Sequence, residues 1–156
     1  MFKKILVPLD GSELAAKILP QVVELAKAQD AQVTLLNIYI DLAGEVSGEA
    51  KVKLMAQEVQ TCEAYLAKVA NNLAAQGVKV KTDCFKGMPP RDIITYAEKN
   101  GMDLIAMATH GKGEVAWVLG STAEKVVSHA TVPVLLIRVL GMKVPELKEA
   151  YLPPVP

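Results

Sequence analysis

Aromatic residues are scarce in this 156-residue chain, at 4% of the sequence. Proteins that hold single-stranded nucleic acid usually stack bases on aromatic side chains, so this scarcity argues against such a partner. Neither sign of charge predominates, because 17 Lys and Arg residues balance 17 Asp and Glu residues. The strongly basic surface typical of nucleic-acid binding is therefore missing, and we expect no nucleic-acid partner.

Long apolar runs and cysteines are also scarce. No run approaches the roughly 20 apolar residues that cross a bilayer, and Pro8 and Asp10 interrupt the apolar start before it can serve as a signal peptide. We expect a soluble, cytoplasmic protein with no membrane partner. Cys62 and Cys84 lack CxxC spacing and neighbouring metal ligands, so we expect buried, reduced thiols and no disulfide.

Several nucleotide and hydrolase motifs are missing. The sequence contains neither G-x-x-x-x-G-K-[ST] nor G-x-S-x-G, which removes the main support for P-loop phosphoryl transfer and serine hydrolysis. Residues 111–116 formally match the dinucleotide pattern G-x-G-x-x-A, but the next strand ends at Arg138 rather than at an acidic residue. An NADP site with Arg138 near the 2′-phosphate stays open as an alternative.

Apolar residues make up 51% of the chain, enough for one domain with a proper core. Five apolar runs predict strands at 5–9, 33–39, 78–85, 104–108 and 133–137. Helical patterns lie between them at 12–29, 52–73, 91–99 and 121–129, the first interrupted by Pro20 and capped by Ser12. This alternation predicts an α/β fold with an open, five-stranded parallel sheet that is doubly wound and Rossmann-like.

The strand order follows from burial patterns. The third strand alternates polar and apolar residues and suits an edge, whereas the first and fourth are wholly apolar and suit the centre, which predicts the order 3-2-1-4-5. Ligands of such sheets bind where the strand order reverses, beyond the carboxyl ends of the strands. This places Asp10 and Gly11 opposite residues 108–111.

The loop after the fourth strand suits a phosphate. Gly120 and Ser121 begin a helix, whose N-terminal N–H groups attract anions, while Gly111 and Gly113 permit close backbone approach. The open alternative is that Ser121 caps its helix with Glu124 in a capping box and that the glycines only turn the chain.

Three polar side chains near this loop have two interpretations each. Asp10 could accept ribose hydroxyls or meet a Mg ion carried by the phosphates, or it could cap the turn into Ser12. His110 could be a general base or an ordinary hydrogen-bonding residue, and Lys112 could neutralise phosphate or be merely solvated. Because no activating pair is evident, we expect at most a slow ATPase and favour a regulator.

Three segments, at 5–12, 103–111 and 120–126, closely resemble the universal stress protein family, and 133–137 continues the match. The resemblance covers residues 2 to about 139, so we expect an α/β domain at 1–140 and a proline-containing tail at 141–156. It implies a stress-response regulatory homodimer and, in one branch, ATP binding. The other branch binds no nucleotide and would act through protein–protein interaction.

The ATP-binding branch carries Gly-x2-Gly-x9-Gly-Ser/Thr after the fourth strand. Here Ala108 replaces the first glycine, and only eight residues separate Gly111 from Gly120. The resemblance implies Asp10 at the ribose, the main chain of Ile38 with Pro8 and Leu9 at adenine, and Met107 near the base. The predicted ATP site comprises Pro8, Leu9, Asp10, Ile38, Met107, Ala108, His110, Gly111, Lys112, Gly120, Ser121 and Thr122.

The fifth strand predicts the dimer contact. Residues 133–138 are apolar on both faces, and the proposed order leaves one side of this strand without a neighbour. A second copy would cover that edge, as the resemblance also implies. The tail from Gly141 could instead fold back over the edge, or each tail could reach across its partner.

Overall fold

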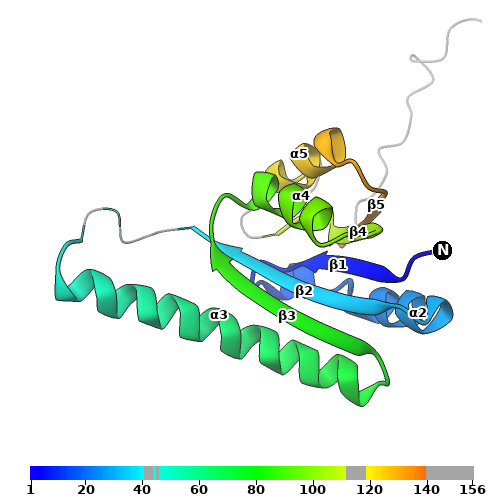
Figure 1. Ribbon diagram of the computed structural model, residues 1–156, viewed down its shortest axis with the longest axis horizontal. Coiled ribbons are helices and arrows are strands. Elements are labelled where there is room, and N and C mark those ends of the chain that lie inside the picture. Colours follow the sequence, from blue (N-terminus) through cyan, green and yellow to red (C-terminus); the bar gives the residue numbers. More distant parts are fainter. Residues whose placement is uncertain (41–43, 45, 112–118, 140–156) are drawn as a thin grey trace, which may run out of the picture.

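Five parallel strands form one sheet in the computed structural model, which describes residues 1–40, 44, 46–111 and 119–139 (Figure 1). The strands are β1 (Lys4–Pro8), β2 (Gln32–Tyr39), β3 (Lys79–Lys86), β4 (Leu104–Ala108) and β5 (Val134–Ile137). The helices are α1 (Glu13–Ala16), α2 (Leu19–Gln29), α3 (Glu49–Ala75), α4 (Pro89–Lys99) and α5 (Ser121–His129). The strand order is β3-β2-β1-β4-β5, which confirms the predicted fold class.

Helices cover both faces of the sheet, with α2 and α3 on one side and α4 and α5 on the other (Figure 1). Side chains alternate between these faces along each strand. In β1, Ile5 and Val7 join the core under α1, α2 and α3, whereas Leu6 joins the core under α4 and α5. Both cores draw on β1 and β4, which explains why these strands are apolar at almost every position.

Local signals in the sequence account for the element boundaries. Ser12 caps α1, its hydroxyl accepting the Ala15 N–H at 3.1 Å, as predicted. Pro20 divides the first helical segment and lies in the first turn of α2, where a missing N–H costs little. Gly77 ends α3 with a φ of 85°, a conformation that favours glycine.

The strand pairing creates a gap at the centre of the sheet. β1 pairs with β2 along its whole length, from Lys4 opposite Gln32 to Pro8 opposite Leu36. On its other side β1 pairs with β4 only at Ile5–Leu104 and Leu6–Ile105, although both strands continue. The carboxyl ends of β1 and β4 are therefore unpaired with each other, at the predicted reversal of strand order.

A disulfide between Cys62 and Cys84 joins α3 to β3, with Cα atoms 6.4 Å apart. The expectation of two reduced thiols is wrong. Cys62 lies on the buried stripe of α3, and that stripe packs on the same side of the sheet as Cys84. The separation of 22 residues gives no local signal, because folding alone brings the two side chains together.

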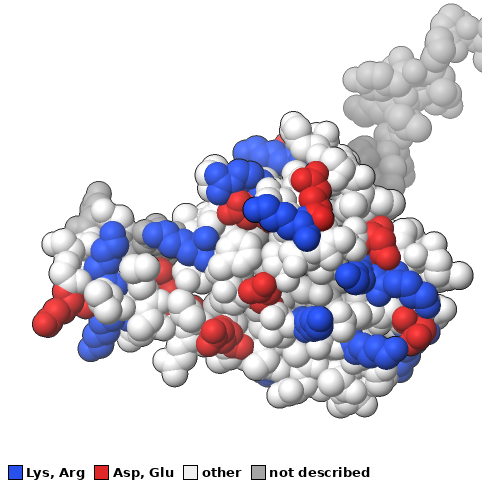
Figure 2. Space-filling model, in the orientation of Figure 1, with Lys and Arg blue, Asp and Glu red and all other residues white. Residues whose placement is uncertain are grey.

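The surface carries both signs of charge. On the face shown in Figure 2, basic and acidic side chains are interspersed. Within the described residues, no helix combines the length and the apolar character needed to span a membrane. The predicted tail at 141–156 and loop residues 112–118, with Lys112 and Gly113, lie outside the described residues.

Candidate functional site

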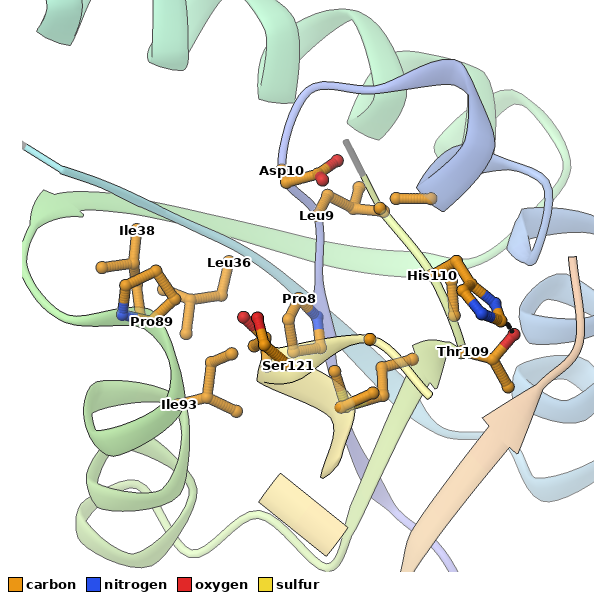
Figure 3. A pocket seen from close by; sticks show the side chains of 17 residues that line it. Pro8, Leu9, Asp10, Leu36, Ile38, Pro89, Ile93, Thr109, His110 and Ser121 are labelled. Atoms are coloured by element: carbon orange, nitrogen blue, oxygen red, sulfur yellow. Dashed lines mark hydrogen bonds between the residues drawn. The ribbon is translucent and has the colours of Figure 1, made fainter. Parts of the chain in front are cut away.

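A cavity of about 270 Å³ lies at the unpaired ends of β1 and β4 (Figure 3). Its volume is close to the lower end of the range of about 300–1,000 Å³ usual for small-molecule sites. Every predicted site residue that the structure describes lines it, and Lys112 lies outside the described residues. The structure adds lining residues that sequence reasoning missed, namely Ala15, Leu36, Pro89, Ile93, Thr109 and Ala123.

One end of the cavity is apolar. Leu36 and Ile38 come from β2, and Pro89 and Ile93 come from the start of α4; Figure 3 shows all four gathered on one side. α4 begins there because the Asp92 carboxylate accepts the Met88 N–H at 2.8 Å and so fixes the turn after β3. The sequence predicted a helix over 91–99, but nothing local indicated that the first turn of α4 borders a cavity.

The backbone of Ile38 faces this apolar end. The Leu9 N–H donates to the Leu36 carbonyl at 2.8 Å, so the backbone groups of Leu36 point toward β1. The Gly87 N–H donates to the Tyr39 carbonyl at 3.0 Å, so those of Tyr39 point toward β3. Backbone groups alternate in direction along a strand, so the N–H and C=O of Ile38 point to the β1 side of β2. They lie beyond the Leu9–Leu36 hydrogen bond, which is the last one described between these two strands.

Asp10 lies at the mouth of the cavity and is held by the turn that follows β1. Its Oδ1 accepts the Ser12 N–H at 2.9 Å and the Ser12 hydroxyl at 2.5 Å, so the turn-capping interpretation is confirmed. The carboxylate also lies against Gly111, which joins β1 to the loop after β4. Burial raises the pKa of Tyr65 on α3, and the negative charge of Asp10 raises it further.

His110 is buried beside the cavity, with 4% of its surface exposed. Its Nδ1 lies 2.8 Å from the Thr109 hydroxyl, as the dashed line in Figure 3 shows. The backbone of Thr109 is fixed in turn, because its N–H donates to the Ile137 carbonyl and its C=O accepts the Gly120 N–H, both at 3.0 Å. The sequence allowed two roles for His110, a general base or an ordinary hydrogen-bonding residue, and this contact with Thr109 corresponds to the second.

The first turn of α5 borders the cavity without a side-chain cap. Gly120, not Ser121, is the N-cap residue, so the predicted capping box is wrong. Ser121 already has helical geometry, and a hydroxyl can cap only from the position before the first helical residue. The backbone N–H groups of 121–123 therefore lack the intrahelical acceptors that later residues have.

No cluster of metal ligands supplements this arrangement. Within the described residues, no three His, Cys, Asp or Glu side chains gather closely enough to hold a metal ion.

The chain is similar to known proteins over most of its length. The family model for the universal stress protein family matches residues 1–138. Universal stress protein MJ0531 of Methanocaldococcus jannaschii is 35% identical over an alignment of 144 residues, and the match covers 88% of this chain and 83% of that protein. The solved structure of protein MJ0577, from the same organism, has a TM-score of 0.80 at 31% identity, covering 88% of this chain and 96% of that one.

A second solved structure, the universal stress protein UspA of Lactobacillus plantarum, has a TM-score of 0.76 at 27% identity and covers 88% of this chain and 98% of that one. The sequence matches and the structural matches therefore point to the same family. This chain belongs to the universal stress protein family.

Proposed function

We propose that the chain is a stress-response regulator that binds ATP in this cavity and acts as a homodimer. The observation that carries the proposal is the layout of a single cavity. An apolar lining beside the Ile38 backbone N–H and C=O, which point toward β1, and an uncapped helix N-terminus border the same cavity. A purine nucleotide has matching parts, because its flat base suits an apolar surface and its anionic phosphates suit a helix N-terminus.

The apolar end suits adenine. Leu36, Pro89 and Ile93 offer apolar surface to a flat base. The Ile38 N–H can donate to N1 of adenine, and the Ile38 C=O can accept from its 6-amino group, which are the acceptor and donor of the Watson–Crick edge. Guanine presents a donor and an acceptor in the reverse order. Backbone groups in this register therefore favour adenine.

The start of α5 suits phosphate. A helix N-terminus combines unpaired N–H groups with the positive end of the helix dipole. Gly120, Ser121 and Thr122 line the cavity at this point, and the Gly120 N–H is anchored on the Thr109 carbonyl. Asp10 would face the ribose and any Mg bound to the phosphates. Because His110 is engaged with Thr109, we expect hydrolysis to be slow at most.

Relatives with bound nucleotides support the proposal at the level of the fold. A universal stress protein was solved in complex with cAMP, and its structure matches this chain with a TM-score of 0.68 at 18% identity. The universal stress protein from Archaeoglobus fulgidus was solved in complex with dAMP and matches at 0.59 and 17%. Both ligands carry adenine, the base that the Ile38 backbone would select.

The proposed dimer contact is β5. Among the described residues, this strand ends the sheet and pairs with β4 alone, so that part of the chain places no strand beside its other row of backbone groups. Leu135 is 39% exposed on it. A second copy could extend the sheet and cover this side chain, as exposed sheet edges commonly permit.

Native mass spectrometry of the purified protein tests the nucleotide proposal. We expect retained ATP, and we expect Gly120→Val to abolish retention because a branched side chain would crowd the start of α5. Gly44→Val is the matched control, since an added Cβ there meets nothing within 4 Å. If the protein retains no nucleotide and shows no thermal shift at millimolar ATP, the nucleotide proposal fails. The alternative is then a universal stress protein that binds no nucleotide and acts through protein–protein interaction.

A further inference from the structure

Gly111 occupies a position where a side chain would collide with Asp10. A Cβ at this residue would lie 3.3 Å from the Asp10 Cγ and closer still to Oδ2. Backbone conformation does not explain the glycine, because Gly111 is absent from the glycines with positive φ, which include Gly11 and Gly77. The space taken by the Asp10 carboxylate is the constraint that the structure shows.

Asp10 can yield this space only by giving up its own contacts. Oδ1 accepts both the N–H and the hydroxyl of Ser12, whereas Oδ2 lies against Gly111. Because both oxygens belong to one planar carboxylate, turning Oδ2 away from residue 111 also moves Oδ1 away from Ser12. A displaced carboxylate would find water, because Asp10 is exposed at the mouth of the cavity. A variant with a side chain at 111 should therefore fold, with the Asp10 carboxylate in another place.

We infer that Gly111 is a positioning residue, which keeps open the space where Asp10 must lie to accept the ribose hydroxyls. This inference rests on the proposed nucleotide function and deepens it. Gly111 then acts through Asp10 on the sugar, and its loss affects discrimination at the ribose before it affects the phosphates. This contact joins the end of β1 to the end of β4.

A stability cycle without nucleotide tests the contact itself. Gly111→Ala should lower Tm by about 2–4 °C in the wild-type background, a typical shift for the loss of one or two hydrogen bonds in a chain of this size. In the Asp10→Ala background, the same substitution should leave Tm nearly unchanged, because the carboxylate is gone. Gly44→Ala provides the matched control, since it changes a glycine in open space.

A binding cycle tests the consequence for the ribose. We expect the wild type to bind ATP about 10-fold more tightly than 2′,3′-dideoxy-ATP, the usual scale for hydrogen bonds to a charged group. Gly111→Ala and Asp10→Ala should each reduce this preference to about 1–2-fold, and combining them should add nothing.

The two cycles separate failure of this inference from failure of the proposed function. Equal effects of Gly111→Ala in both backgrounds, on Tm and on the ribose preference, would overturn the positioning role. A preserved ribose preference in Gly111→Ala would also overturn it. If the wild type binds no nucleotide while the stability cycle is non-additive, the proposed function and the ribose role fail, and only the steric dependence of Gly111 on Asp10 remains.

Discussion

At the residue scale, the base end of the cavity presents main-chain groups of Ile38 among apolar side chains. We expect ATP to bind at least about 10-fold more tightly than ITP, because inosine reverses the donor and acceptor that Ile38 would meet, at a cost of about 1–3 kcal/mol. Isothermal titration calorimetry measures both affinities. ITP is a better comparison than GTP, because GTP also carries a 2-amino group that could change its affinity for another reason. Equal affinities would contradict this assignment of the Ile38 edge.

Tyr96 on α4 predicts a change in stability at alkaline pH. Burial, aided by the nearby Asp83 carboxylate, raises the pKa of Tyr96 to about 12. In the unfolded chain the phenol ionises near its usual pKa of about 10, so the unfolded state loses its proton first as pH rises. The stabilisation is complete below about pH 10 and is lost as pH rises toward 12.

Urea denaturation at several pH values between about 9 and 12 measures this effect. Tyr96→Phe should lose less unfolding free energy across this window than the wild type. Tyr65, whose pKa is also raised, is present in both chains and cancels in the comparison. Identical pH profiles would show that Tyr96 titrates normally in the folded protein.

At the element scale, the disulfide fastens α3 to the edge strand β3. A cross-link that closes 22 residues restricts the unfolded chain, and the loop-entropy relation gives a stabilisation of about 3 kcal/mol. We therefore expect dithiothreitol to lower the unfolding free energy by about this amount in urea denaturation. The doubly substituted Cys62→Ala, Cys84→Ala chain should not respond to the reductant, and an equal response of both chains would contradict the prediction.

Sequence patterns predicted those elements whose signals are local. The alternation in residues 78–85 marked an edge strand because each face of β3 meets a different environment. Pro20 marked the break between α1 and α2 because it lacks an N–H donor. The disulfide had no such signal, because the pairing of Cys62 with Cys84 depends on how a helix packs against a strand.

The cavity was predictable to a similar extent. Its residues on β1 and β4 follow from strand order, since parallel strands bring their carboxyl ends to one edge. Pro89 and Ile93 were missed because the packing of α4 over β2 is a tertiary feature. The cap of α5 was wrongly placed by one residue, since Ser121 and Gly120 both suit a helix start in sequence and only the backbone distinguishes them.

At the scale of the whole molecule, the open edge of β5 predicts the state of association. Leu135→Glu should convert the proposed dimer to a monomer. The substitution removes an apolar side chain from the proposed contact and places a negative charge from each copy at the same interface, where the two charges repel each other. Light scattering after size-exclusion chromatography measures the mass. Val52→Glu is the matched control, because Val52 is 69% exposed on α3, on another part of the molecule. A monomeric wild type would contradict the dimer.

The short pairing between β1 and β4 divides the sheet into two unequal blocks that meet along a narrow seam. β1 to β3 form one block and β4 with β5 the other, and the cavity takes its walls from both. A molecule bound in the cavity would contact both blocks and stabilise them against separation. Saturating ATP should therefore slow hydrogen exchange at the backbone amide of Leu6, which faces β4, more than at the Ile105 amide, which donates to the Pro133 carbonyl within the second block. Equal slowing at both amides would indicate general stabilisation instead. In this way a bound molecule would hold the two parts of the sheet together at the point where their own pairing stops.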